Sequence, residues 1–258
     1  MNRITKIFKN NKALITYLTA GDPDISKTEE YILAMALNGA DLIEIGIPFS
    51  DPVAEGETIQ NAMVRALSKN INLEDIFGIV LNVRKKSDIP LVFMTYLNPM
   101  FFYGYEKFFK RCKEVGLDGI IVPDMPFEEQ EEVKHFARKY SITIITLIAP
   151  TSKKRIPILA KQAEGFIYLV SSLGVTGLRS RITTDIKAIM SEIKNVTDIP
   201  VAVGFGISKT SQAKEIVKCA DGVIIGSAVV KIIEQYKVNA AVKLANYASE
   251  LKKAIILN

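Results

Sequence analysis

The chain has 258 residues, of which 48% are apolar and 24% are charged, with a net charge of +5, two cysteines and one histidine. This length and composition exclude a disordered chain and suit one large α/β domain or two smaller ones. Cys112 and Cys219 are too few for a disulfide framework, and together with the single His135 they argue against a transition-metal site. We therefore expect reduced thiols in the cytoplasm.

The modest positive charge does not indicate a nucleic-acid partner. The basic residues are scattered, and the short runs at 84–86 and 153–155 lack the interleaved aromatic residues that stack on bases. The first twelve residues contain no apolar signal core, and no run approaches the ~18 apolar residues of a membrane span. We expect one domain over residues 1–258 that binds neither nucleic acid nor membrane.

Short apolar runs that end in turn residues recur along the whole chain. Segments with helical spacing lie between them, such as 31–36 and 108–115. Eight strand–helix units in about 250 residues match a (β/α)8 TIM barrel in number and length. A doubly wound sheet is the alternative, but it rarely contains eight evenly spaced strands. The predicted strands are residues 13–18, 42–47, 90–96, 119–122, 142–148, 166–170, 200–203 and 222–225.

Two additions to the repeat are expected. An amphipathic segment with Ile4, Ile7 and Phe8 precedes the first strand, and we predict an extra N-terminal helix there that closes the bottom of the barrel. The second unit is enlarged by residues 48–60 and two helices, so its loop is a candidate lid or partner contact. The first full helix is expected to open at Ser26 with a capping box that ends at Glu29.

The residue types at the strand ends restrict the chemistry. The predicted strands contain no lysine, which argues against a Schiff-base aldolase, and no histidine is available there as a base or electrophile. Carboxylates remain as the candidate acid–base groups. They are Asp22, Glu44, Asp51, Glu55, Glu57 and Asp124.

Glu44 is the most informative of these carboxylates. In the run 42–47 three isoleucines alternate with Leu42, Glu44 and Gly46, so one face is β-branched and the other carries the glutamate. We expect the isoleucines to pack against the outer helices and Glu44 to point into the barrel. Burial would raise its pKa and suit it to acid–base chemistry near neutral pH. A purely structural glutamate, bonded to backbone or hydroxyl groups, is the other interpretation.

Glycine-rich turns follow the last three predicted strands, at 174–177, 204–208 and 226–228. Glycine lets backbone N–H groups approach a ligand closely, and a helix that begins near Ser227 would direct its positive end at an anion. Phosphate sites of this fold lie in the same region. The pattern predicts a phosphorylated substrate.

Several motifs resemble the tryptophan synthase alpha subunit family, and the likeness covers nearly the whole chain. The most specific are GIPFSDPVA at 46–54 and SLGVTG at 172–177, and others are YLTAGDP at 17–23, MTYLNP at 94–99, VPD at 122–124, GFGIS at 204–208 and GSAVVK at 226–231. The resemblance implies a TIM-barrel lyase of tryptophan biosynthesis that cleaves indole-3-glycerol phosphate to indole and glyceraldehyde 3-phosphate. It also implies a β-subunit partner in an α2β2 complex, contacted through 48–51 and 98–99, and no cofactor.

The resemblance also assigns residues to roles. Glu44 matches the family's catalytic glutamate, and Glu55 matches the carboxylate that holds the indole N–H. The indole pocket would be lined by Tyr17, Met94, Ile121, Tyr168 and Phe205. Thr176 lies in the sixth loop, which closes over substrate in the family. The phosphate would be held by Gly177, Gly204, Gly206, Gly226 and Ser227.

One motif departs from the family pattern. The family usually has aspartate-glycine-proline-threonine after PVA, whereas this chain has Glu55-Gly56-Glu57-Thr58. Glu55 keeps the charge but reaches one methylene further. A second hypothesis is therefore an alpha subunit that cleaves substrate weakly and mainly binds and activates its partner. A third is another phosphate-binding barrel enzyme, such as a sugar-phosphate isomerase.

Overall fold

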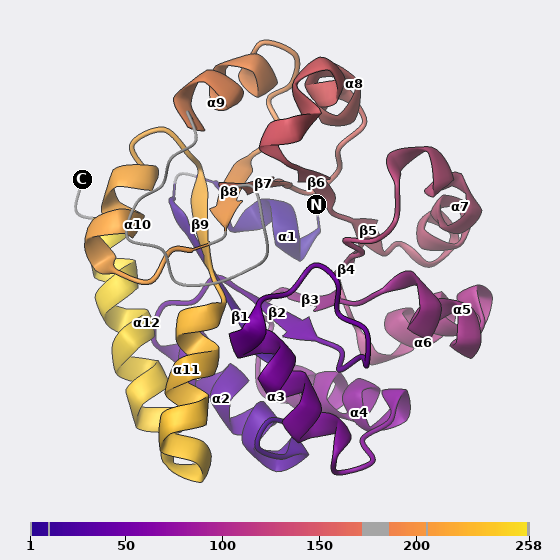
Figure 1. The fold of residues 1–258 in the computed structure, drawn as a ribbon, viewed down its shortest axis with the longest axis vertical. Coiled ribbons are helices and arrows are strands. Elements are labelled where there is room, and N and C mark those ends of the chain that lie inside the picture. Colours follow the sequence, from indigo (N-terminus) through magenta and orange to yellow (C-terminus); the bar gives the residue numbers. More distant parts are fainter. Residues whose placement is uncertain (1, 10, 172–185, 205, 257–258) are drawn as a thin grey trace.

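A nearly closed sheet of parallel strands forms the centre of the computed structural model, which describes residues 2–9, 11–171, 186–204 and 206–256. The strands lie in the order β5-β4-β3-β2-β1-β9-β8-β7-β6, with helices around them (Figure 1). The predicted TIM barrel is confirmed. The strands are β1 (Ala13–Thr19), β2 (Leu42–Gly46), β3 (Leu91–Met94), β4 (Gly119–Ile121), β5 (Thr143–Ile144), β6 (Thr146–Ile148), β7 (Ile167–Val170), β8 (Val201–Gly204) and β9 (Gly222–Ile225).

The fifth predicted strand, 142–148, is divided in the structure. Its first half, β5, pairs with β4, and its second half, β6, pairs with β7. Ile145 lies between the halves, and its N–H still donates to the carbonyl of Ile120 at 2.9 Å. The chain therefore passes from the pairing with β4 to the pairing with β7 at this residue.

Twelve α-helices surround or close the barrel in the described part of the chain. They are α1 (Arg3–Lys6), α2 (Ile25–Leu37), α3 (Glu57–Leu67), α4 (Leu73–Arg84), α5 (Leu97–Tyr103), α6 (Tyr105–Val115), α7 (Glu131–Tyr140), α8 (Ile156–Lys161), α9 (Ile186–Lys194), α10 (Thr210–Ile216), α11 (Ser227–Tyr236) and α12 (Ala241–Ile256). Short 3-10 turns are η1 (Phe127–Glu129), η2 (Pro150–Arg155) and η3 (Lys237–Asn239). None of these helices is long and apolar enough to cross a membrane.

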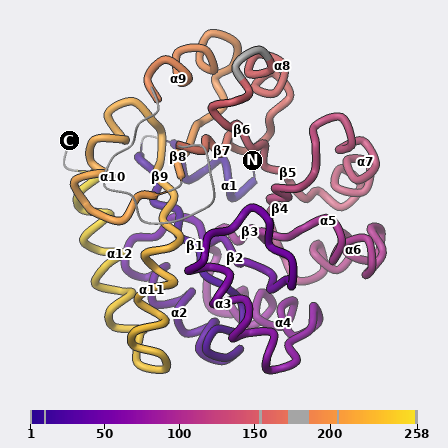
Figure 2. Tube along the Cα trace, viewed as in Figure 1, coloured from indigo at the N-terminus to yellow at the C-terminus, as the bar shows by residue number. Residues whose placement is uncertain are grey.

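The expected N-terminal helix is α1, which lies inside the ring of strands in both views (Figures 1 and 2). Ile4 is fully buried, and Phe8 packs on Phe166 with ring centroids 5.6 Å apart. A side chain at Gly119 or Gly222, where β4 and β9 begin, would come within about 3.3 Å of Ile4 or Phe8. The segment therefore closes the amino-terminal end of the barrel, as its amphipathic pattern predicted.

The N-cap of the first long helix lies two residues before the predicted one. α2 begins at Ile25, and its N-cap is Asp24, whose side chain accepts the N–H of Lys27 at 2.8 Å. The Ser26 hydroxyl donates to the same carboxylate. The predicted capping box at Ser26 is therefore wrong, because the carboxylate two residues earlier already accepts a free N–H group of the first turn.

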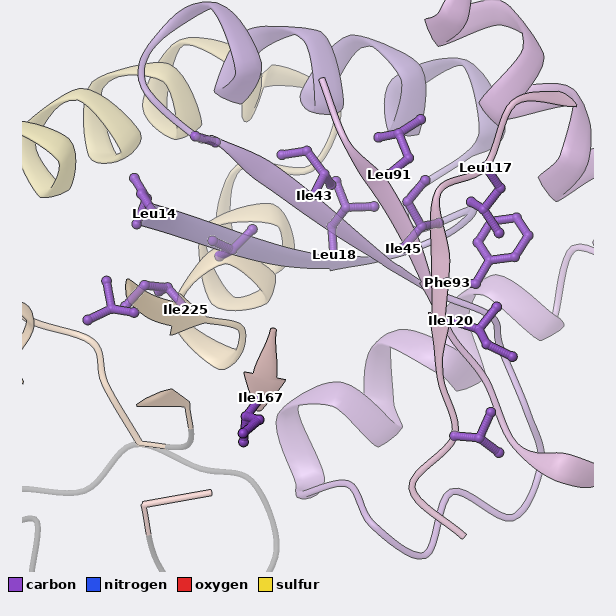
Figure 3. Close-up of a cluster of buried hydrophobic side chains, with 14 of the residues drawn as sticks. Leu14, Leu18, Ile43, Ile45, Leu91, Phe93, Leu117, Ile120, Ile167 and Ile225 are labelled. Atoms are coloured by element: carbon purple, nitrogen blue, oxygen red, sulfur yellow. The ribbon is translucent and has the colours of Figure 1, made fainter. Parts of the chain in front are cut away.

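Each strand separates two apolar layers. Ile43 and Ile45 of β2, and Ile47 just after the strand, face outward into the layer shared with the helices, part of which is shown in Figure 3. Leu42 faces the barrel interior. The interior layer also contains residues of α3, which covers the barrel from the other end: Ile59, Ala62 and Met63. The alternation read from the run 42–47 is therefore confirmed, and it directs Glu44 inward.

Aspartates just before three strands connect neighbouring strands at the amino-terminal end of the barrel. Each carboxylate accepts the N–H at the start of the preceding strand in the barrel, so one side chain joins two β–α units. The pairs are Asp41 with Leu14 at 2.7 Å, Asp118 with Leu91 at 2.9 Å and Asp221 with Val201 at 2.9 Å. A cation also contacts each carboxylate, namely Lys252, Arg84 and Lys194 respectively.

Replacing Asp118 with alanine should destabilise the fold by about 3 kcal/mol, because the change removes the acceptor of Leu91 N–H and leaves the buried Arg84 guanidinium without this carboxylate. Urea unfolding measures the loss. Asp88 is the matched control. Asp88 and Asp118 both pair with Arg3, but Asp88 is 93% exposed, so Asp88→Ala should change the stability little. Equal losses in the two variants would contradict this interpretation.

Candidate active site

A cavity opens at the carboxyl-terminal end of the barrel, opposite α1. The space between its lining atoms is about 400 Å³ and is partly open to solvent. Its described lining residues come from strands on both sides of the barrel and from the segments after β2, β8 and β9. They are Tyr17, Glu44, Glu55, Ile59, Met94, Tyr168, Gly206, Ile207, Ile224, Gly226 and Ser227.

Glu44 lies on the interior face of β2, in register with Tyr17 of β1 and Val92 of β3. It is 1% exposed, and its Oε1 atom has no hydrogen-bond partner among the described residues. Burial raises the pKa of Glu44 well above its usual value, and the nearby charge of Glu55 raises it further. The side chain is therefore suited to hold a proton at neutral pH and to release it to a bound molecule.

Glu55 reaches the same cavity from a different part of the chain. It lies in the loop 47–56, between β2 and α3, and is fully buried. Its backbone is held by two hydrogen bonds, from its own N–H to the carbonyl of Pro52 at 3.0 Å and from Gln60 Nε2 to its carbonyl at 2.8 Å. Two carboxyl groups thus share one site that is largely shielded from water.

Two tyrosines with glycines beside them shape the wall of the cavity. A Cβ on Gly46 would lie 2.1 Å from the Tyr17 hydroxyl, and a Cβ on Gly204 would lie 2.5 Å from the Tyr168 hydroxyl. Both tyrosines are almost completely buried, and burial followed by the charge of Glu55 or Glu44 raises the pKa of each hydroxyl well above its usual value. They therefore remain neutral, and the glycines provide the space for them.

The structure brings most of the predicted site residues together. Tyr17, Glu44, Glu55, Met94, Tyr168, Gly206, Gly226 and Ser227 all line the cavity. Ile121 lies in the same interior layer as Met94, and Gly204 lies beneath Tyr168, but neither lines the cavity. Thr176, Gly177 and Phe205 lie outside the described residues.

Three lining residues were not predicted from the sequence: Ile59, Ile207 and Ile224. The inward direction of Ile224 could have been predicted from the alternation of β9, because Ile224 is two residues after the inward-facing Gly222. Ile59 could not be found in this way, because its position depends on α3 folding across the end of the barrel.

The other candidate carboxylates have different surroundings. Asp22 is buried in a bidentate pair with Arg65, at 3.0 and 2.8 Å, and Asp124 accepts the N–H of Leu97. Asp51 and Glu57 are exposed. Of the candidates, the cavity is therefore lined by Glu44 and Glu55 alone.

The part of the cavity near β8 and β9 lacks a cationic side chain among its described lining residues. Gly226 is the N-cap of α11, a helix of ten residues, and Ser227 is its first residue. An anion at this point would rely on backbone N–H groups and on the positive end of the helix.

A TIM barrel with two buried carboxyl groups in a cavity at its strand ends has the architecture of an enzyme. The profile of the family "Tryptophan synthase alpha chain" matches residues 5–256. The chain belongs to this family, which is a family of lyases.

Individual relatives agree with the family match. A tryptophan synthase alpha chain of Thermoanaerobacter sp. is 47% identical over 99% of this chain and all of its own length, and that of Lacticaseibacillus casei is 44% identical over 99% and 96%. Among solved structures, tryptophan synthase of Mycobacterium tuberculosis matches with a TM-score of 0.91 at 32% identity, covering 100% of this chain and 99% of its own. The alpha subunit of Legionella pneumophila has a TM-score of 0.88 at 35% identity, with coverage of 99% and 98%.

Replacing Glu44 with glutamine should stabilise the protein increasingly as the pH rises above about 4.5. Below that pH the carboxyl group is neutral in both states, so the two side chains are equivalent. Above it the unfolded chain loses the proton while the folded chain retains it, because burial raises the folded pKa. The wild type therefore loses about 1.4 kcal/mol for each unit by which the pKa is raised.

Urea unfolding at a series of pH values measures this difference. Glu192→Gln makes the same change on an exposed position of α9 and should show no such growth with pH. A pH-independent effect of Glu44→Gln would mean that Glu44 is ionised in the folded protein.

Proposed function

We propose that this lyase cleaves indole-3-glycerol phosphate to indole and glyceraldehyde 3-phosphate, with Glu44 as the acid and base and Glu55 as the partner of the indole N–H. The observation that carries the proposal is the burial of both carboxyl groups in one cavity at the end of the barrel. Their mutual repulsion favours a state with one proton, which is the state the reaction needs.

The reaction begins with transfer of the Glu44 proton to C3 of the indole. The ring nitrogen then carries positive charge and can accept the electrons of the bond between C3 and the glycerol side chain. As that bond breaks, the side-chain hydroxyl loses its proton to the Glu44 carboxylate and becomes the aldehyde. Glu44 is thereby returned to its starting state, and the route requires no cofactor.

Glu55 supplies the negative charge that stabilises the protonated ring. A fixed carboxylate in a site shielded from water stabilises developing positive charge more strongly than water does. We propose that the ring lies among Tyr17, Met94, Ile121, Tyr168 and Phe205. Placement of Tyr17, Met94 and Tyr168 around the same cavity as both carboxyl groups supports this orientation.

The phosphate is assigned to the part of the cavity near β8 and β9. Gly206, Gly226 and Ser227 line it there, at the start of α11, and the sequence motifs add Gly177 and Gly204, with Thr176 in the loop that would close over the substrate. Backbone N–H groups at a helix start bind phosphate without a cationic side chain.

We also propose that the chain works in the cytoplasm, in an α2β2 complex with a tryptophan synthase β subunit. The supporting feature is an exposed apolar surface beside the site: Val53 in the loop 47–56 is 73% exposed, and Phe101 and Phe102 on α5 are 68% and 92% exposed. Ser50, Asp51 and Asn98, which belong to the segments expected to contact the partner, are also exposed, whereas Pro48 is buried. Such a surface is typical of a protein–protein contact.

Replacing Glu44 with glutamine should lower kcat for indole release by at least 100-fold, because glutamine cannot transfer the proton. The affinity for an indole-propanol phosphate analogue should change less than about threefold. Indole release is assayed with purified β subunit present. Wild-type turnover in the variant would refute the assignment of Glu44. Negligible release by the wild type, together with strong activation of the partner, would instead support a mainly regulatory subunit.

Replacing Phe102 with aspartate should weaken β-subunit binding by about tenfold or more, because the exposed ring would lose apolar contact area and a charge would enter the interface. Titration of the stimulated indole release with β subunit gives the affinity. Val242 is 68% exposed on α12, a helix that lies on the other side of the barrel from α5 (Figure 1). Val242→Asp is therefore the matched control and should bind normally. Unchanged binding by the Phe102 variant would place the interface elsewhere.

A further inference from the structure

Glu55 is the site residue that most needs external support. Glu44 is fixed by the register of β2, but Glu55 lies in the loop 47–56, outside any helix or strand. A displacement of about 1 Å in a catalytic group can lower a rate about 100-fold, so the contacts that hold this loop, such as the hydrogen bond from Gln60, bear on turnover.

Tyr96 provides a contact of this kind. It follows β3, and its ring stacks on Phe49 at a centroid distance of 5.2 Å and an angle of 30°. Its hydroxyl accepts the N–H of Ala54, the residue immediately before Glu55, at 3.1 Å. One side chain thus contacts the loop at both its beginning and its end. Tyr96 is 2% exposed, so water does not compete well for this hydrogen bond.

Tyr96 is itself held by the barrel. It is the N-cap residue of α5, and the N–H of the next residue, Leu97, donates to both carboxylate oxygens of Asp124 at 3.0 and 3.2 Å. Asp124 follows β4. The loop emerges from β2, but the contacts of Tyr96 and Asp124 fix its position relative to β3 and β4.

Tyr96 does not belong to the lining of the cavity. The negative charge of Glu55 nevertheless contributes to a raised pKa of the Tyr96 hydroxyl, second to burial, which indicates that the two groups are near each other. Tyr96 is therefore near the second carboxylate without being part of the surface that would meet substrate.

We propose that Tyr96 is a positioning residue for the lyase reaction, which holds Glu55 at the indole nitrogen by accepting the Ala54 N–H and stacking on Phe49. This inference rests on the proposed function of Glu55. It predicts that the hydroxyl of Tyr96 affects turnover through Glu55 and has little effect on substrate affinity.

The test is a double-mutant cycle with Tyr96→Phe and Glu55→Gln, measured as indole release with β subunit present. Phenylalanine keeps the ring but removes the acceptor. In the wild-type background Tyr96→Phe should lower kcat by about 10- to 100-fold, with KM and the affinity for indole-propanol phosphate within about threefold. In the Glu55→Gln background the same change should alter kcat by less than about threefold.

Tyr103 is the matched control. Its hydroxyl donates to Glu74 at the outer surface of α5, so Tyr103→Phe removes one hydroxyl from a neighbouring position without touching the loop, and kcat should stay within about twofold. Thermal unfolding of each variant confirms that it is folded.

Two results would overturn the inference while leaving the proposed function intact: wild-type kcat in Tyr96→Phe, or an equal loss in both backgrounds, which would indicate a general structural effect. If the wild-type chain released no indole in the same assay, the proposed function would fail, and the role of Tyr96 with it.

Discussion

The burial of two carboxyl groups in one cavity is the constraint on which the rest of this structure depends. Glu44 and Glu55 are 1% and 0% exposed, and their negative charges oppose each other. Leaving such groups in a protein interior is costly unless one of them holds a proton or a ligand supplies a positive charge. A bound molecule that develops positive charge would relieve this repulsion, as the proposed reaction requires. A protein selected only for stability would not retain both groups there.

Glu44 and Glu55 are positioned in different ways, the first by a strand and the second by a loop. Glu44 is set by parallel pairing, because the register of β2 against β1 and β3 fixes the direction of each side chain. Glu55 is set by the contacts of a loop. Gly46 and Gly204 allow Tyr17 and Tyr168 to pack against the strands beside the two carboxyl groups, so the cavity wall is determined partly by residues that have no side chain. The aspartates at the amino-terminal ends of β2, β4 and β9 keep the strands aligned at the opposite end of the barrel.

The agreement between sequence and structure is strongest where one local pattern is sufficient. The alternation in the run 42–47 directed Glu44 inward, and the amphipathic start placed a helix beneath the barrel. The divided fifth strand was not visible in its apolar run, because β5 and β6 differ only in the neighbours that they pair with. The start of α2 was misplaced because both Asp24 and Ser26 are good capping residues, and only the backbone geometry distinguishes them. Ile59 enters the cavity from a helix whose packing has no local signal.

The amino-acid sequence alone determined the barrel and the family, because strand periodicity and motifs are properties of neighbouring residues. Strand alternation also singled out Glu44, and the family resemblance singled out Glu55. Tertiary structure alone decided that Glu44 and Glu55 share one water-poor cavity, that Gly204 accommodates Tyr168, and that Tyr96 holds the loop before Glu55. These relations join residues on different strands and loops, 11 positions apart for the carboxylates and 42 for Tyr96 and Ala54. Their distances in space, and the desolvation that raises the pKa of Glu44, exist only after the sheet has closed.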